Sequence, residues 1–134
     1  MGKVYIHSFN SSDFHDFAEL IRNGEVENFQ ISKGRFSGMV ERAITPNLIV
    51  SKFSQNRCVF QHGYGASGYF TFLIWDPRIS FNWRNNHLKE GVVAVLLGIE
   101  HVALLNEGFV GYPISIREEF FVNFCKTKGL RHLP

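Results

Sequence analysis

Short apolar runs alternate with turn residues along most of this chain, and this rhythm constrains the fold more than any other feature. Each run is rich in β-branched and aromatic residues, which favour strands. The breaks contain Gly, Pro, Asn or Asp, the residues that tight turns require. The runs cover residues 26–32, 35–44, 47–53, 57–62, 68–75, 79–83, 92–97, 101–106 and 109–115. Because no helical pattern separates one run from the next, a Rossmann-like parallel sheet is excluded, and a mainly β fold with an enclosed interior is predicted.

One helix is predicted before the β region, over Asp13–Asn23. Ser11 or Ser12 is expected to cap its N-terminus, and Gly24 is expected to end it. One side of this helix is apolar and consists of Phe14, Phe17, Ala18 and Ile21. Their spacing is that of a single helical stripe, so we expect this side to lie against the outside or the open end of the β structure.

A second helix is predicted after the last run, over residues 116–128. Ser115 as N-cap and Glu118 three residues later form a capping box, and Gly129 marks the end. The apolar side of this helix consists of Phe120, Phe121, Phe124 and Cys125. This side either covers the protein's own core or meets its copy on a second subunit. Because covering a core needs fewer rings, we assign the three phenylalanines to a homodimer interface.

Composition limits the functional classes that remain open. The 134 residues suit a single domain, residues 1–134. Lys and Arg number 14 against 12 Asp and Glu, a net charge of +2, which is too balanced for a nucleic-acid-binding surface. No apolar run reaches the length of a signal or membrane segment, and Cys58 and Cys125 lack the spacing of a metal or redox site. We expect a soluble, cytoplasmic protein with reduced thiols and no membrane partner.

The segment Gly63–Gly68 matches the GxGxxG pattern of nucleotide-binding sites. In such a site the pattern leads from a strand into a helix, whose N-terminus faces the phosphates. Here both flanking segments have the composition of strands. We therefore interpret the segment as a wide hairpin loop whose glycines adopt positive φ angles.

Metal binding and catalysis find no support in the motifs. None of the six histidines is spaced His-x-His or His-x-x-x-His, and two ligands on alternate residues are needed for one strand to hold a metal on one face. Gln61 and His62 are adjacent and point to opposite faces. No nucleophile elbow, catalytic triad or carboxylate pair is present. We expect no metal, no cofactor and no enzymatic activity.

Aromatic residues are abundant, with 14 Phe, 4 Tyr and 2 Trp, which fits either a filled core or a ring-lined cavity. Arg42 shares a strand face with Val40 and Ile44, so its charge must reach solvent, pair with an acid or meet an anionic ligand. The other candidates are polar or aromatic side chains on strand faces, for which a purely structural role is the alternative. The candidate ligand-binding residues are Arg42, Gln61, His62, Phe72, Trp83 and His101.

Glycines and aromatic residues follow a recognisable order between residues 14 and 115. The matching segments are Phe14-His15-Asp16-Phe17, Phe29-Gln30-Ile31, Gly34-Arg35-Phe36-Ser37-Gly38, Arg57 with Gln61 and Gly63, Phe70-Thr71-Phe72, Phe81 with Trp83, Gly91 before Leu97-Gly98, and Gly108-Phe109 before Ile114-Ser115-Ile116. This order resembles the N-terminal sensor domain of AraC-type bacterial transcriptional regulators, in the cupin-like group without metal ligands. Val92 and Leu97 depart from that family, which often has an acidic residue and a proline at these places.

The resemblance implies a cupin-like β-barrel of the jelly-roll or double-stranded β-helix type, with one N-terminal and one C-terminal helix. It also implies a domain that senses a small-molecule effector or dimerises, joined in the full-length protein to a DNA-binding helix-turn-helix domain. That second domain is not expected within residues 1–134, so DNA is not an expected partner of this fragment. Two alternatives remain open. One is a small cupin-type enzyme, such as an isomerase, epimerase or dioxygenase, and the other is a ligand-free structural dimerisation module.

Overall fold

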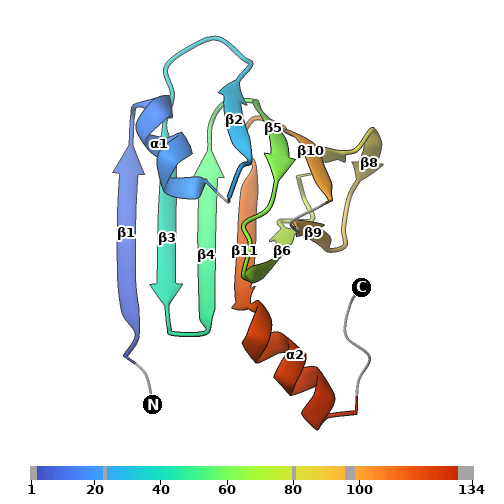
Figure 1. The fold of residues 1–134 in the computed structure, drawn as a ribbon. Coiled ribbons are helices and arrows are strands. Elements are labelled where there is room, and N and C mark those ends of the chain that lie inside the picture. The colour runs from blue at the N-terminus through green and yellow to red at the C-terminus, as the bar shows by residue number, and fades with distance from the viewer. Residues whose placement is uncertain (1–2, 23, 80, 96–98, 130–134) are drawn as a thin grey trace.

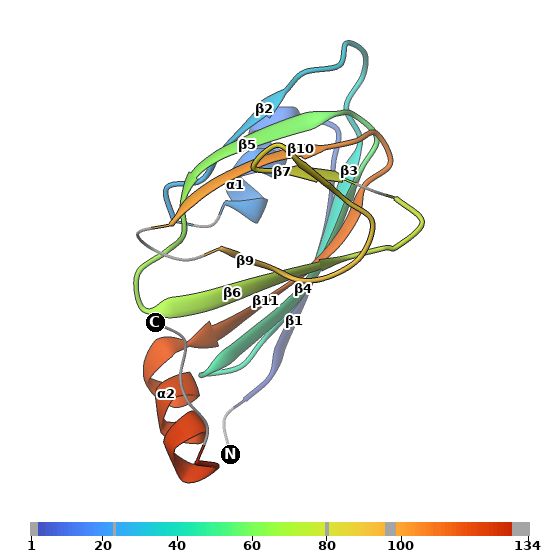
Figure 2. The same ribbon diagram turned by 90° about the vertical axis from the view of Figure 1, so that its right-hand side faces the viewer.

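The computed structural model describes residues 3–22, 24–79, 81–95 and 99–129. Within these residues the protein is mainly β, and two antiparallel sheets are accompanied by two short helices (Figure 1). Figure 2 shows the two sheets one above the other, with α1 at the margin between them. Neither sheet closes on itself within the described part. The bend expected at Leu97-Gly98 and the chain after Gly129 lie outside the described residues.

The larger sheet contains six of the strands that the described residues form. Their spatial order is β1 (Tyr5–Ser11), β3 (Gly38–Ile44), β4 (Leu48–Gln55), β11 (Val110–Arg117), β6 (Tyr69–Trp75) and β9 (Val93–Val95). The smaller sheet has five, in the order β2 (Glu27–Gln30), β5 (Val59–Tyr64), β10 (Glu100–Leu105), β7 (Phe81–Trp83) and β8 (Asn86–Leu88). Neighbours such as β4 and β11 are far apart in sequence, so non-local pairing holds the larger sheet together.

Side chains along each strand alternate between the interior and the surface, as the apolar runs predicted. In β4, Ser51 and Phe53 are buried, whereas Val50 is exposed. The aromatic excess fills much of the interior: the ring of Phe109 lies 5.7 Å from that of Phe53 and 5.4 Å from that of Phe81, measured between centroids. The core consists of Phe17, Phe36, Val40, Phe53, Leu73, Trp75, Phe81, Val93, Ala103, Leu105 and Phe109.

Helix α1 (Phe14–Ile21) covers the margin where the two sheets part, because it contacts β1 and β3 of the larger sheet and β2 of the smaller one. Its apolar side faces inward, and Phe17 is fully buried. The expected cap was wrong. The side chain of Asp13 accepts from the backbone N–H of Asp16, while Ser11 bonds to the backbone of Asp13. An acidic cap suits the positive end of the helix dipole.

Strand β1 was not predicted. It pairs with β3 along its whole length, from Tyr5 opposite Ile44 to Ser11 opposite Gly38. Its sequence lacks the apolar alternation that marks a half-buried strand, and nearly all of its residues are exposed. The strand forms because β3 offers it a free edge.

The Gly63–Gly68 segment contains the last two residues of β5 and the connection to β6, and these strands belong to different sheets. The expected hairpin is therefore wrong, because the loop carries the chain from one sheet to the other. The expectation about glycine conformation is confirmed at Gly63 and Gly68, with φ of +145° and +84°. At Gly63 a Cβ atom would lie 2.1 Å from the carbonyl oxygen of Glu25, so only glycine allows this close approach.

The predicted start of the second helix was also wrong. Ser115 belongs to β11, and its hydroxyl lies 2.9 Å from that of Thr71 on β6. Helix α2 (Glu118–Thr127) follows β11 without a connecting loop, and Arg117 at its N-cap makes no capping side-chain bond. Gly129, with φ of +68°, follows the end of the helix as predicted. Neither helix in the described part of the chain has the length and apolar character needed to span a bilayer.

Candidate functional site

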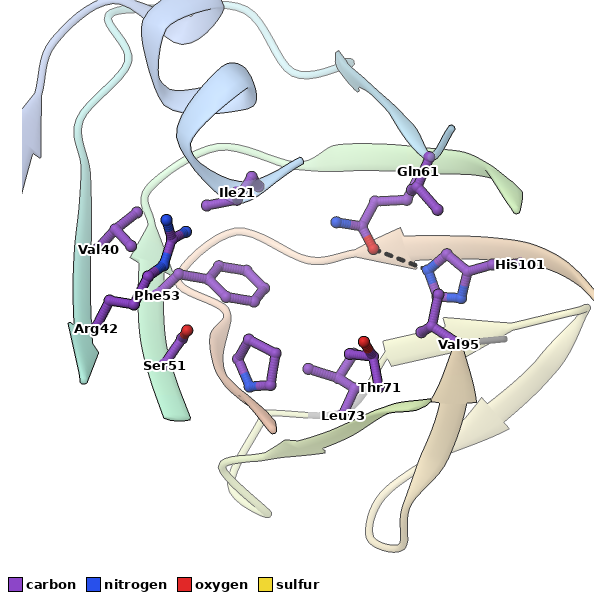
Figure 3. Close-up of a pocket in the computed structure, with 12 residues that line it drawn as sticks. Ile21, Val40, Arg42, Ser51, Phe53, Gln61, Thr71, Leu73, Val95 and His101 are labelled. Atoms are coloured by element: carbon purple, nitrogen blue, oxygen red, sulfur yellow. Dashed lines mark hydrogen bonds between the residues drawn. The ribbon is translucent and has the colours of Figure 1, made fainter. Parts of the chain in front are cut away.

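A cavity of about 60 Å³ lies between the two sheets, beside the end of α1 (Figure 3). The larger sheet contributes most of its wall, the smaller sheet contributes the Gln61 and His101 side, and α1 contributes Ile21. The apolar lining includes Val40, Phe53, Leu73 and Val95, and the polar lining consists of Arg42, Ser51, Gln61, Thr71 and His101. A mostly apolar interior with a few polar groups is the usual form of a small-molecule site.

A neighbouring space of about 240 Å³, the outer chamber, shares part of its lining with the cavity. Arg42, Ser51 and Thr71 line both spaces, so these polar groups stand at the boundary between them. Arg22 and Tyr69 line the outer chamber but not the cavity. Arg42 is therefore accessible to a ligand in either space.

Arg42 is half-buried and lacks an acidic partner. No carboxylate of the described residues lies within 4.0 Å of its guanidinium. One of its nitrogens donates to the carbonyl oxygen of Leu20, in the last turn of α1. Burial lowers the pKa of Arg42, yet an arginine remains protonated at neutral pH. The cavity therefore contains a positive charge that no side chain of the described protein neutralises.

His101 lies at the opposite side of the cavity, in a chain of hydrogen bonds. The indole N–H of Trp83 donates to Nδ1 of His101 over 3.2 Å, and an indole can only donate. The ring proton therefore sits on Nε2, which donates to Oε1 of Gln61 over 2.9 Å. Nε2 of Gln61 in turn donates to Asn28 over 2.9 Å. Both ring nitrogens of His101 are thus engaged, and the amide of Gln61 has a fixed orientation.

Burial holds His101 in its neutral form. The side chain is only 2% exposed, and this burial, with a smaller effect from the charge of His62, lowers its pKa to about 4. A neutral ring suits the hydrogen-bond chain, since a second ring proton would oppose the N–H of Trp83. The role of His101 is to hold Gln61 in position.

The structure brings three of the six candidate ligand-binding residues together around the cavity: Arg42, Gln61 and His101. Trp83 does not line it but donates to His101 from behind. His62 points to the surface, where its Nε2 lies 2.9 Å from Glu100. Phe72 lies on the outer face of the larger sheet, against Phe121 of α2. The expectation that His62 and Phe72 line the interior was wrong, because each follows an inward-facing residue and so points outward.

Ser51, Thr71 and Asn28 belong to the site but were not singled out from the sequence. Ser51 and Thr71 are small polar residues at inward positions of β4 and β6, and both are buried. A polar residue on the buried face of an apolar strand was the signal that could have found them. Asn28 is recognisable only through its bond to Gln61, since the register of β2 against β5 brings them opposite each other.

The predicted dimer residues lie on α2 in two different environments. Phe121 packs on the protein's own larger sheet, with ring centroids 5.1 Å from Phe70 and 6.1 Å from Phe72. Phe120 and Phe124 are 48% and 47% exposed. Part of the apolar side thus covers the sheet, and part remains open.

The described residues contain no group of three or more His, Cys, Asp or Glu side chains that could hold a metal ion. Comparisons with protein-family models, curated proteins and solved structures gave no match to this chain. The resemblance to AraC-type sensor domains therefore stays a prediction from the sequence.

Proposed function

We propose that this chain is the effector-sensing and dimerisation domain of a bacterial transcription regulator. The observation that carries the proposal is the cavity between the sheets, in which an unpaired Arg42 and an oriented Gln61 face apolar walls. Arg42 is partly buried and has no acidic partner among the described residues, and an anionic group of a ligand would provide one. The resemblance to AraC-type sensors supplies the transcriptional setting and the cytoplasmic location, and it implies a DNA-binding domain in the full-length regulator.

The order of the strands supports a cupin-like arrangement. Between β4 and β7 the chain alternates from the larger sheet to the smaller one, back to the larger and again to the smaller. Alternation of consecutive strands between two facing sheets is typical of jelly rolls. In such a fold the space between the sheets is the natural place for a ligand.

A direct path from the cavity to α2 supports a sensing role. Pro113 on β11 lines both the cavity and the outer chamber, and Ser115 lines the chamber. The strand continues to Arg117, and α2 begins at Glu118. A ligand that displaces β11 therefore displaces α2, and a two-state helix position is what ligand-linked dimerisation requires.

Dimerisation is supported by the open part of the α2 apolar side. Two phenylalanine rings, Phe120 and Phe124, leave nearly half of their surface exposed on one short helix. Aromatic rings are among the residues enriched in protein interfaces. Burial of both rings against a second α2 would remove this surface from water.

Ligand binding is tested by thermal unfolding in the presence of sugars, amino alcohols, fatty acids and aromatic acids. We expect one chemical class to raise the unfolding temperature by several degrees, because a ligand that binds only the folded state stabilises it. Stabilisation by none of these classes would contradict the sensor and favour a ligand-free module. The bound compound is then recovered and examined by NMR, since its conversion to a product would favour the enzyme instead.

Dimerisation is tested by sedimentation equilibrium of the chain from low to high micromolar concentration. We expect a dimer that the double variant Phe120→Ala, Phe124→Ala shifts to monomer. Phe29→Ala is the matched control, because Phe29 is also 48% exposed but lies on β2 of the smaller sheet. A strict monomer at high micromolar concentration, or equal weakening by the control, would refute the dimer interface.

A further inference from the structure

Arg42 has most of its hydrogen-bonding capacity unused. A guanidinium offers five N–H donors, and the described residues provide one acceptor, the carbonyl oxygen of Leu20. A carboxylate takes two parallel N–H bonds from such a fork. The side chain is held between the inner cavity and the outer chamber, where a ligand entering from either space meets it. The free donors and the unneutralised charge therefore favour an anionic ligand group at this point.

The surroundings of Arg42 favour a carboxylate over a phosphate. Arg42 is the one cationic side chain in the described lining of the inner cavity, and Arg22 lines the outer chamber but not this cavity. A phosphate group carries nearly two charges at neutral pH, and a single guanidinium neutralises one. The neighbouring hydroxyls of Ser51 and Thr71 add neutral hydrogen-bonding groups without adding charge.

The inner cavity favours a short apolar body behind the charged group. Val40, Phe53, Leu73 and Val95 form its walls, and its volume of about 60 Å³ holds a few carbon atoms, so a longer chain would extend into the outer chamber. Each buried methylene contributes about 0.8 kcal/mol to binding. A sugar, with hydroxyls on every side, would leave several of them without partners against these walls.

The far side of the cavity presents one further donor. The amide nitrogen of Gln61 has two hydrogens, and its recorded bond within the described residues, to Asn28, uses one. In Figure 3 this nitrogen points into the cavity, while the amide oxygen is bonded to His101. Because His101 and Trp83 fix the orientation of the amide, the second hydrogen of this nitrogen is left for a ligand in the cavity.

We propose that the cavity binds a small monocarboxylic acid, with its carboxylate on Arg42, its apolar body against Phe53 and Leu73, and a hydrogen-bond acceptor such as a keto or hydroxyl oxygen on Gln61. This inference rests on the proposed sensing function and names the chemical class that is sensed. It predicts a defined order of affinities among compounds with one carbon skeleton.

The order is measured by isothermal titration calorimetry with four probes: 5-oxohexanoic acid, hexanoic acid, hexanamide and 1-hexanol. We expect 5-oxohexanoic acid to bind more tightly than hexanoic acid, and hexanamide and 1-hexanol to bind about 10- to 100-fold more weakly than hexanoic acid, the range of a bidentate charged hydrogen bond. Equal affinity for acid, amide and alcohol would overturn the carboxylate assignment.

Three arginine variants test whether Arg42 binds the carboxylate of the ligand. Arg42→Met is expected to bind hexanoic acid about 10- to 100-fold more weakly, and Arg42→Gln, which keeps a donor for Leu20 but has no charge, should lose as much. The second variant covers the case in which Arg42→Met does not fold. Arg35→Met, at an exposed arginine that lines neither space, is the matched control and should retain wild-type affinity. Wild-type affinity in a folded Arg42 variant would overturn the proposal.

The variant Gln61→Leu tests whether Gln61 binds the acceptor oxygen at the far end of the ligand. We expect it to abolish the advantage of 5-oxohexanoic acid over hexanoic acid while leaving the affinity for hexanoic acid nearly unchanged. Unchanged discrimination by the folded variant would overturn the assignment of Gln61. If none of the four probes binds but a sugar or amino alcohol stabilises the protein, the carboxylic-acid inference fails and the sensing function stands. If nothing binds, both fail.

Discussion

The buried neutral His101 makes the stability of this protein depend on pH in a way that can be calculated. Its pKa is lowered from an ordinary 6.5 to about 4 in the folded state, first by burial and then by the charge of His62. The unfolded chain therefore binds a proton at higher pH than the folded chain does. Stability from this group is fully present above pH 6.5 and is lost progressively as the pH falls toward 4.

The magnitude follows from the two pKa values. Each unit of difference corresponds to about 1.4 kcal/mol, so complete protonation in both states removes about 3 kcal/mol of unfolding free energy. Between pH 7 and pH 5 the loss is about 2 kcal/mol. This is a large share of the 5–15 kcal/mol by which a domain of this kind is stable.

The variant His101→Gln provides the test. Glutamine retains one donor for Gln61 and one acceptor for Trp83 but does not titrate. Urea unfolding, followed by far-UV circular dichroism at pH 7, 6 and 5, gives the unfolding free energy of both proteins. We expect the wild type to lose about 2 kcal/mol more than the variant over this range. His15→Gln, at an exposed histidine of α1, controls for removal of a histidine as such. Parallel pH profiles for wild type and His101→Gln would refute the reasoning.

Three further predictions follow from the packing. Trp83→Phe removes the donor to Nδ1, so the pKa of His101 should rise, which histidine NMR titration measures; an unchanged pKa would contradict the hydrogen-bond chain. Gly63→Ala should lower the unfolding free energy by about 2 kcal/mol or more, because the new Cβ atom meets the backbone of Glu25. A Cβ atom at Gly68 meets no atom within 4 Å, so Gly68→Ala should lower the unfolding free energy only by the cost of a positive φ angle, about 1–2 kcal/mol. Equal losses in urea unfolding would argue against the contact with Glu25. Phe109→Ala should lose about 3–5 kcal/mol because the ring is fully buried, and a loss below about 1 kcal/mol would contradict the packing described for the core.

Features that depend on local periodicity were predictable from the sequence. The two-residue alternation identified most strands, and the stripe with Phe17 and Ile21 identified the inward side of α1. Arg42 was predicted to share a strand face with Val40 and Ile44, and the structure places it around one cavity with two other candidates, Gln61 and His101. These predictions have a common basis: side chains alternate between the two faces of a strand whichever strands pair with it.

Features that depend on distant pairing were not predictable. Ser115 has the chemistry of a helix cap, but pairing of β11 with β4 and β6 keeps it in a strand, and tertiary contacts outweigh a capping preference of about 1 kcal/mol. The Gly63–Gly68 segment has strand-like flanks whether it forms a hairpin or joins two sheets. Phe72 is as apolar as any core residue, and only its contact with Phe121 of α2 shows that it lies on the outer face of the larger sheet.

The absence of a loop between β11 and α2 has a mechanical consequence. Strand β11 ends at Arg117 and α2 begins at Glu118, so a rotation at this point would move the whole helix, and Ser115, two residues earlier, lines the outer chamber. A helix of 10 residues is about 15 Å long. A rotation of about 10° at this point would carry the far end of the helix about 2.6 Å. In the dimer proposed above, a movement of this size would be enough to separate two facing aromatic rings.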